Sequence, residues 1–492
     1  MFLRRFYDEQ LAQASYMIGC TATGAALVVD ANRDAEQYVA VAAAEGVRIT
    51  HVTETHIHAD FVSGSLELAR ATGARLYLSD EGGADWRYAF AERESAVPLR
   101  DGSCFDVGRV RVSVMHTPGH TPEHLTFLVT DTATADRPMG AFTGDFVFAG
   151  DVGRPDLLER AAGVSGTMEA SARVLFRSLG RLAALPDYLQ LWPGHGSGSA
   201  CGKALGAVPQ TTLGYERLFN WAFGVRDEEE FVRMVLAGQP EPPKYFAQMK
   251  RVNRDGPRVL GGVRRPERLA ASRLAPLLAE GALVVDTRHT ADFAAGHVPG
   301  TINIPLNKSF TTWAGWLLPY DRDFYLIVDE DEDGARSARA TRDLTMIGLD
   351  RIAGHFGADV QDAWTAEGRE LETVPQMDAA TLRSALERGD AAVIDVRGAA
   401  EWNAGHLPGA RHVPLGYLAD HLAELPRDVP LVMQCQGGSR SAIASSVLLA
   451  RGFGTVVNLT GGYGGWVRDG GEVVGGGQGP EAGDQGDLGK AG

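Results

Sequence analysis

The chain has 492 residues, and at roughly 150 residues per domain we expect about three domains. Acidic residues outnumber basic ones by 63 to 47, and the net charge of -16 disfavours a nucleic acid partner. No secretory signal and no run of 18 apolar residues is evident, so we expect a cytoplasmic protein with no membrane partner. Four scattered cysteines exclude a disulfide framework: Cys20, Cys104, Cys201 and Cys435.

Short apolar runs alternate with helical patterns over the first part of the chain, which predicts an α/β layered domain at residues 1–237. We expect strands at 25–29, 75–79, 109–117 and 124–130, and helices at 34–45, 65–72 and 165–182. His, Asp and Gly residues cluster where these strands end, which is where catalytic groups usually lie. Residues 238–266 contain several Gly and Pro residues and are predicted to form a linker.

An internal repeat follows the predicted linker. The segment VVDTRHTADFAAGHVPGTINIP recurs as VIDVRGAAEWNAGHLPGARHVP, with the Asp and His positions shifted by the same 109 residues (286 to 395 and 297 to 406). The repeat predicts two related α/β modules, at residues 267–372 and 373–469. The Gly-rich, polar tail at 470–492 is predicted to be disordered.

The stretch THIHADF places His56, His58 and Asp60 at alternate positions, so that in an extended loop they face one cavity. Further candidates follow: His120 in TPGHT, Asp145 in FTGD and His195 in WPGHGSG. In this order the segments resemble the metallo-β-lactamase fold, whose glyoxalase II-like hydrolases carry H-x-H-x-D-H, PGH, GD and a final His. The resemblance implies an αββα sandwich.

Phe61 stands where those hydrolases have the last histidine of the first motif, so the second of their two metal sites loses a ligand. The persulfide dioxygenases of this fold use one iron, and the resemblance implies that His56, His120 and Asp145 hold one Fe(II) per chain. Two histidines and one carboxylate leave three adjacent positions open on Fe(II), enough for a substrate sulfur and O₂. A closed tetrahedral zinc site could not bind both.

The remaining motif residues have two interpretations each. His58 and Asp60 are expected to orient the ligand imidazoles or bound water, although Asp60 alternatively caps the next helix. His195 is expected to form hydrogen bonds rather than to bind the metal, and direct ligation stays open. The lone histidines His51, His116 and His124 are interpreted as ordinary hydrogen-bonded residues.

Two residues outside these motifs are candidates for substrate contacts. Arg154, in GRPDL, would hold a substrate carboxylate or form an ion pair with Asp156. Cys201, in a Gly-rich stretch after His195, would line the pocket entrance and meet the substrate sulfur, or be buried and inert.

Both repeats resemble rhodanese (sulfurtransferase) modules, through D-x-R, GH-x-PG and a loop of the form C-x-x-G-x-R-S. The second copy has CQGGSRS, in which inward-pointing backbone N–H groups stabilise an anion at a helix N-terminus. Cys435 is therefore the expected sulfur acceptor, assisted by the charge of Arg440. Gly437 and Gly438 permit close backbone approach and, with Ser439, are expected to contact the substrate.

The first copy has DEDGARS, which places Asp331 at the cysteine position. A carboxylate cannot carry sulfane sulfur, and the neighbouring acids repel anions, so we interpret this module as a non-catalytic spacer that packs the other two domains. The D-x-R pairs, Asp286 with Arg288 and Asp395 with Arg397, are expected to be structural ion pairs.

The fusion of these modules resembles the bacterial persulfide dioxygenase–sulfurtransferase proteins. This implies Fe(II)- and O₂-dependent oxidation of a low-molecular-weight thiol persulfide to sulfite and thiol, with sulfane-sulfur transfer through Cys435 that gives or uses thiosulfate. We also expect a homo-oligomer. Two alternatives stay open: a dinuclear zinc glyoxalase II-like thioester hydrolase, and a non-oxidising sulfur-carrier or persulfide-responsive interaction protein. The sequence identifies neither the thiol nor the direction of sulfur flow.

Overall fold

The structure is a computed structural model that describes residues 1–157, 159, 166–199, 201–203, 205–239, 241–329 and 334–475. The chain divides into two compact units. The first comprises Met1–Ala270 and Leu306–Ala358, and the second comprises Ala271–Pro305 and the chain from Asp359 onward. The second half of the first repeat therefore belongs to the same unit as the N-terminal domain.

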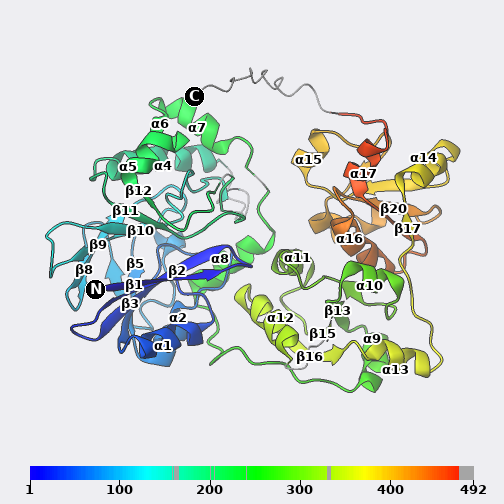
Figure 1. The fold of residues 1–492 in the computed structure, drawn as a ribbon, viewed down its shortest axis with the longest axis horizontal. Helices are drawn as coiled ribbons and strands as arrows, with labels where there is room; N and C mark the ends of the chain where they lie inside the picture. Colours follow the sequence, from blue (N-terminus) through cyan, green and yellow to red (C-terminus); the bar gives the residue numbers. More distant parts are fainter. Residues whose placement is uncertain are drawn as a thin grey trace, which may run out of the picture. The chain divides into compact units, whose positions relative to one another are not determined.

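Two six-stranded sheets form the centre of the first unit (Figure 1). One sheet has the order β1-β2-β3-β4-β5-β6, with the strands Phe2–Asp8, Gln13–Cys20, Ala25–Val29, Arg48–Thr53, Arg75–Ser79 and Val97–Leu99. The other has the order β12-β11-β10-β9-β8-β7, with β7 to β12 at Cys104–Val107, Val110–His116, Leu125–Asp131, Gly140–Gly144, Gln190–Pro193 and Thr211–Thr212.

Side chains alternate between the two faces of each strand, so the hydrophobic core has three layers: one between the two sheets and one on the outer face of each sheet. In β2, Tyr16 and Ile18 face the other sheet, where they meet Phe127 and Trp192, whereas Met17 faces outward. The outward face of this sheet is covered by α1 (Ala35–Ala44) and α2 (Ser65–Thr72). The outer face of the second sheet packs against α4 (Met168–Leu182), α5 (Leu213–Phe219), α6 (Trp221–Gly224) and α7 (Glu228–Leu236). The predicted αββα sandwich is confirmed.

Most predicted elements of this domain are present with small differences at their ends. The strands expected at 25–29 and 75–79 and the helix expected at 65–72 agree with β3, β5 and α2 residue for residue. The strands expected at 109–117 and 124–130 correspond to β8 and β9, and the helix at 34–45 corresponds to α1. The helix expected from residue 165 begins at Met168, and residues 160–165 lie outside the described residues.

The predicted linker at 238–266 contains a helix, so this prediction is wrong for its central part. Helix α8 (Tyr245–Asp255) buries Tyr245, Phe246, Met249 and Asn253, which recur along one helical face. The helix-breaking residues flank the helix instead of interrupting it, since Pro243 precedes it and Gly256 ends it. The helical spacing of the buried residues on this face is typical of a helix, but the Gly and Pro residues on either side favoured a linker.

The part of the first repeat that belongs to the first unit contains two helices and a parallel strand pair. The helices are α11 (Phe310–Leu317) and α12 (Ala335–Met346), and the strands are β15 (Phe324–Val328) and β16 (Ile352–Gly357). These residues cluster with the N-terminal domain rather than with the second repeat.

The second unit contains the parallel pair β13 (Leu283–Asp286) and β14 (Ile302–Asn303), with α9 (Leu274–Ala279) and α10 (Thr290–Ala295). Its larger sheet is parallel, in the order β17-β21-β20-β18-β19, with β17 to β21 at Gln376–Met377, Ala392–Asp395, Arg411–His412, Leu431–Gln434 and Val456–Leu459. The remaining helices are α13 (Val360–Ala366), α14 (Ala379–Arg388), α15 (Ala399–Asn403), α16 (Ser439–Leu449) and α17 (Gly462–Arg468). The expected α/β fold of the repeats is confirmed.

The start of the Gly-rich tail is ordered by backbone pairing, which corrects the prediction of disorder from residue 470. Val474 exchanges two backbone hydrogen bonds of 2.9 Å with His406. Residues 476–492 lie outside the described part of the chain.

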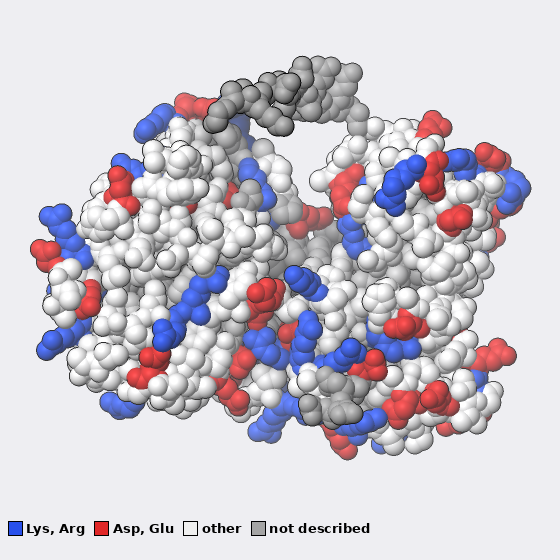
Figure 2. All heavy atoms as spheres, viewed as in Figure 1, with Lys and Arg blue, Asp and Glu red and all other residues white. Residues whose placement is uncertain are grey.

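Acidic and basic side chains are both present on the face seen in Figure 2. Among the described residues, no helix has the length and apolar character needed to cross a membrane.

Candidate functional site

Three loops at the ends of strands bring His56, His120 and Asp145 together. His56 follows β4, His120 follows β8 and Asp145 follows β10 directly. One candidate ligand atom from each residue lies within 4.8 Å of the other two, and all three side chains are buried. The three residues that the sequence selected as one ligand set therefore form one cluster.

The free atoms of this cluster fit a metal ion. His56 Nδ1 lies 3.0 Å from Thr55 Oγ1, and His120 Nδ1 lies 3.1 Å from the carbonyl oxygen of Arg154, which leaves both Nε2 atoms for a ligand role. His120 Nε2 is 3.6 Å from Asp145 Oδ2, a buried carboxylate oxygen with no hydrogen-bond partner. A buried oxygen without a partner is costly unless a cation satisfies it.

The protonation of the cluster also suits a metal. Burial lowers the pKa of His56 well below its ordinary value and lowers that of His120, which favours the neutral imidazoles that bind metals. Burial alone would raise the pKa of Asp145, but the charge and hydrogen bond of His195 hold it well below its usual range. Two neutral imidazoles and one carboxylate are thus available at one point.

Asp30 anchors the loop that carries His56. This buried residue ends the first predicted strand, adopts a left-handed φ of 54°, and accepts hydrogen bonds from Thr55 N at 2.6 Å and Thr55 Oγ1 at 2.9 Å. Because Thr55 Oγ1 in turn lies 3.0 Å from His56 Nδ1, the Asp30 carboxylate fixes the His56 imidazole through Thr55. Asp30 lies outside the metal-site motifs of the sequence, and its one sequence signal is its place directly after an apolar strand.

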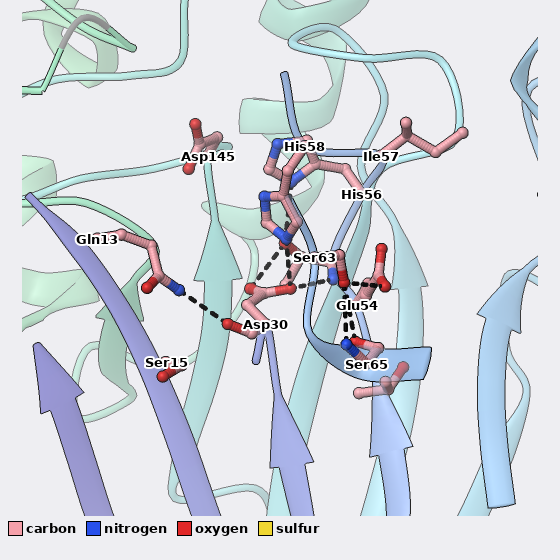
Figure 3. A network of polar contacts seen from close by, with 12 residues as sticks. Gln13, Ser15, Asp30, Glu54, His56, Ile57, His58, Ser63, Ser65 and Asp145 are labelled. Carbon is pink, nitrogen blue, oxygen red and sulfur yellow. Dashed lines mark hydrogen bonds and ion pairs between the residues drawn. The ribbon is translucent and has the colours of Figure 1, made fainter. Parts of the chain in front are cut away.

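His58 points toward Asp30 rather than toward the three-residue cluster. Its Nε2 lies 3.2 Å from Asp30 Oδ1, and its Nδ1 is buried without a partner (Figure 3). Burial lowers the pKa of His58, but the charge and hydrogen bond of Asp30 outweigh burial and raise it to about 9. The ring also packs edge-on against His56, with the centroids 4.3 Å apart.

His195 connects the two acidic residues of the site. Its Nδ1 lies 2.7 Å from Asp145 Oδ1, and its Nε2 lies 2.8 Å from Asp60 Oδ2. Burial lowers the pKa of His195, but the two carboxylates outweigh it and raise the pKa well above its ordinary value. The alternative that Asp60 caps the next helix is wrong, because α2 has Gly64 at its N-cap and no side-chain cap.

Cys201 belongs to a second cluster, with Asp60 and His195, whose candidate ligand atoms also lie within 4.8 Å of one another. Burial, and then the charge of Asp60, raise the pKa of this thiol well above its ordinary value, so the protonated thiol is favoured.

Phe61 is fully buried, and its ring packs against His58 with the centroids 4.4 Å apart. The phenyl ring of Phe61 therefore fills the position where the two-metal hydrolases have the last histidine of the first motif.

Arg154 is fully buried and holds Asp156 through two nitrogens, at 2.9 and 2.7 Å. The structure thus favours the ion pair over a contact with a substrate carboxylate. Of the histidines interpreted as ordinary, His116 is within 2.8 Å of the Pro122 carbonyl oxygen, and His51 is 2.8 Å from Thr50 Oγ1. His124 also has a hydrogen-bond partner, since its Nδ1 lies 2.9 Å from Thr117 Oγ1, while its buried ring stacks on His56 and its Nε2 has no partner.

The second repeat places Cys435 directly after β20, at the start of the loop that leads into α16. Its sulfur accepts a hydrogen bond from the N–H of Gly438 at 3.1 Å and lies 3.4 Å from Ser441 Oγ. Gly438 has a φ of 106°, a conformation that favours glycine. The side of the loop at Gly437 is open, since a Cβ there would meet nothing within 4 Å.

Arg440 is held beside this loop by a residue that the motif search missed. Its two terminal nitrogens donate to the carboxylate of Glu401 at 2.6 and 2.7 Å. The Glu401 carboxylate also lies 3.3 Å from the N–H of Gly398 at the start of α15. Glu401 is part of the repeated segment, but its place opposite the loop arginine required the fold.

The D-x-R pairs are ion pairs in both repeats, as expected. Arg288 Nη2 lies 2.7 Å from Asp286 Oδ2, and Arg397 Nη2 lies 2.7 Å from Asp395 Oδ2. Asp331, at the position of the missing cysteine, lies outside the described residues with its neighbours 330, 332 and 333.

Comparisons with known proteins agree with this division of the chain. The model of the metallo-beta-lactamase superfamily matches residues 9–195, and the model of the rhodanese-like domain matches residues 270–356 and 378–469. A probable metallo-hydrolase of Burkholderia pseudomallei (strain 1710b) is 30% identical over 220 residues, which cover 40% of this chain and 72% of that protein. The chain belongs to the metallo-beta-lactamase superfamily.

Two further similarities extend the match. A hydroxyacylglutathione hydrolase of Rhodopseudomonas palustris (strain ATCC BAA-98 / CGA009) is 30% identical over 262 residues, covering 52% of this chain and 89% of that protein. The crystal structure of a metallo-beta-lactamase from Staphylococcus aureus subsp. aureus COL is 42% identical with a TM-score of 0.64, covering 72% of this chain and 98% of that one. The protein is a metal-dependent enzyme of this superfamily, fused to two rhodanese-like domains.

Proposed function

We propose that this superfamily member is a persulfide dioxygenase with sulfurtransferase activity. The reaction converts a thiol persulfide, O₂ and water into the thiol, sulfite and a proton, so the terminal sulfur loses four electrons and O₂ gains four. The observation that carries the proposal is the set of His56, His120 and Asp145 with one unpartnered carboxylate oxygen, together with Phe61 at a motif position where the two-metal hydrolases have a histidine.

Fe(II) held by these three residues would supply activation of O₂ beside the substrate sulfur, because a 2-His-1-carboxylate set leaves three adjacent positions open. The chain itself orients the ligands: Thr55 holds His56, and the carbonyl oxygen of Arg154 holds His120. Burial of the cluster excludes bulk water, and His195 keeps a proton between Asp145 and Asp60.

The second repeat would use the product. The Cys435 thiolate attacks the outer sulfur of a second thiol persulfide, the S–S bond of that persulfide breaks, and its thiol leaves as the thiolate, so that Cys435 holds the sulfur as a persulfide. Sulfite then attacks this outer sulfur, and the bond to Cys435 breaks, which gives thiosulfate and regenerates the Cys435 thiolate. The Gly438 N–H stabilises the anionic sulfur, and Arg440, fixed by Glu401, stabilises the approaching dianion. The same steps in reverse would use thiosulfate. A thiol persulfide, O₂ and sulfite or thiosulfate are the proposed partners.

A dinuclear thioester hydrolase is the second candidate. It is favoured by the second cluster of Asp60, His195 and Cys201 and by the name of the hydroxyacylglutathione hydrolase relative. Against it stand Phe61 and the fused sulfurtransferase module, which has no part in hydrolysis.

Oxygen uptake with a panel of thiol persulfides tests the proposal. Protein loaded anaerobically with Fe(II) is expected to consume one O₂ per persulfide and to form sulfite, whereas zinc-loaded protein is expected to do neither. Thioester hydrolysis by the zinc-loaded form, without oxygen uptake by the iron-loaded form, would instead establish the second candidate.

A further inference from the structure

The loop that begins with the metal-ligand candidate His56 is held from outside the sandwich by Asn253 of α8. Asn253 is buried, and its Nδ2 donates to the carbonyl oxygens of His58 at 2.8 Å and Phe61 at 2.7 Å. Its Oδ1 accepts a hydrogen bond from the N–H of Ser63 at 2.9 Å. The side-chain amide of Asn253 therefore fixes three backbone groups of the segment 58–63. We call this segment, together with His56, the ligand loop.

The first repeat supplies a second attachment to the same loop. The N–H of Val62 donates to the carbonyl oxygen of Met346, the last residue of α12, at 2.7 Å. Close by, the buried Arg33 donates to the Thr345 carbonyl oxygen at 3.1 Å and pairs with Asp350 at 2.6 Å. The end of α12 is thus bound both to the ligand loop and to the segment that follows Asp30.

Helix α8 in turn packs closely on the first repeat. A Cβ at Gly315 of α11 would lie 2.5 Å from the ring of Tyr245, so this contact requires glycine. At Gly348, just after α12, a Cβ would lie 3.2 Å from Met249 and 3.1 Å from Val62. The repeat therefore touches the loop directly and also supports the helix that carries Asn253.

We propose that α11, α12 and Gly348 of the first repeat, with α8, form a clamp that positions the ligand loop of the metal centre, with Asn253 as the positioning residue. The first repeat has Asp331 where a sulfurtransferase has its cysteine. In this proposal it acts in the metal domain instead of in sulfur transfer. The inference rests on the metal centre of the proposed function, and its readout is metal binding rather than turnover.

The decisive variant is Asn253→Asp in the full chain. It keeps the size of the side chain and the acceptor for Ser63, but it turns a carboxylate oxygen toward two carbonyl oxygens that now receive a hydrogen bond. We expect Fe(II) affinity, measured anaerobically by chelator competition, to fall about 10- to 100-fold, as for other changes that disturb ligand orientation. The electron paramagnetic resonance spectrum of the Fe(II)–nitrosyl form should change as well. Gln248→Glu is the control, the same chemical change on the same helix away from the loop.

A second variant tests the contribution of the first repeat. Gly315→Val places a side chain against Tyr245 and should also weaken Fe(II) binding and alter the spectrum, whereas Gly454→Val, where a Cβ meets nothing within 4 Å, should not. Circular dichroism and thermal unfolding of the metal-free proteins check folding, and Asn253→Ser replaces Asn253→Asp if the latter does not fold.

Wild-type affinity and an unchanged nitrosyl spectrum in both the Asn253 and Gly315 variants would overturn the clamp. Failure of the proposed function has a different signature, because wild-type protein would then bind Fe(II) without consuming O₂ in the presence of a persulfide.

Discussion

His195 and Asp145 share a short contact that satisfies only one of the two oxygens of the Asp145 carboxylate. His195 Nδ1 lies 2.7 Å from Asp145 Oδ1, while Asp145 Oδ2 is buried without a hydrogen-bond partner. One oxygen is thus satisfied by the protein, and the other is left for a cation.

Replacing this carboxylate should remove the metal. We expect Asp145→Asn to weaken Fe(II) binding by more than about 100-fold, since losing a direct ligand exceeds the 10- to 100-fold cost of losing an outer partner. Oxygen uptake should be lost in parallel, as measured by metal analysis and an oxygen electrode. Asp106→Asn, at an exposed surface ion pair, is the control. Retention of iron and activity would remove Asp145 from the ligand set.

Cys435→Ser should separate the two activities. The serine hydroxyl cannot carry sulfane sulfur, so formation of thiosulfate from persulfide and sulfite should fall to the uncatalysed rate, while oxygen uptake stays near the wild-type level. Thiosulfate is measured by chromatography, and Cys104→Ser, at an exposed cysteine, is the control. Thiosulfate formation at the wild-type rate in the Cys435 variant would show that another residue carries the sulfur.

Glu401→Gln should weaken the same transfer without abolishing it. The change removes the charge that fixes Arg440 through two hydrogen bonds, and we expect kcat/KM for sulfite to fall about tenfold, or about 1.4 kcal/mol. Oxygen uptake should not change. Steady-state kinetics at several sulfite concentrations measure the effect, and an unaltered kcat/KM would mean that Arg440 needs no partner.

Asp343 of α12 offers a test by pH. Burial, and then the charge of Asp8, raise the pKa of its carboxyl to about 6 from the ordinary 3.8. Because the folded-state pKa is raised, the stabilisation from the protonated form is present below about pH 4 and is lost as the pH rises through about 6. Asp343→Asn mimics that form and should increase stability at pH 7 by about 1–3 kcal/mol, with little effect at pH 4. Thermal unfolding at both pH values measures this, and an equal effect at both would refute it.

The grouping of His56, His120 and Asp145 follows from the resemblance to the metallo-β-lactamase motifs, and the structure brings these residues together because each follows an apolar strand. His56, His120 and Asp145 lie far apart in the chain, yet the strand ends of a layered α/β domain meet at one edge. Asp30 followed the same rule but stood alone, without a second polar residue to mark it.

The contacts made across the chain could not be predicted in this way. Asn253 binds backbone carbonyls nearly 200 positions earlier in the chain, and a lone Asn carries no local signal of such a role. Its helix was interpreted as part of a linker because Gly and Pro dominate the flanking residues. The grouping of residues 306–358 with the N-terminal domain likewise depends on tertiary packing rather than on the period of the repeat.

The most direct test of the whole account is the metal content and oxygen demand of the purified protein. Metal analysis of protein reconstituted with equal Fe(II) and zinc, followed by oxygen uptake with a thiol persulfide, should find one iron per chain and one O₂ consumed per sulfite formed. Two zinc ions per chain, with cleavage of thioesters under anaerobic conditions and no oxygen uptake, would contradict it.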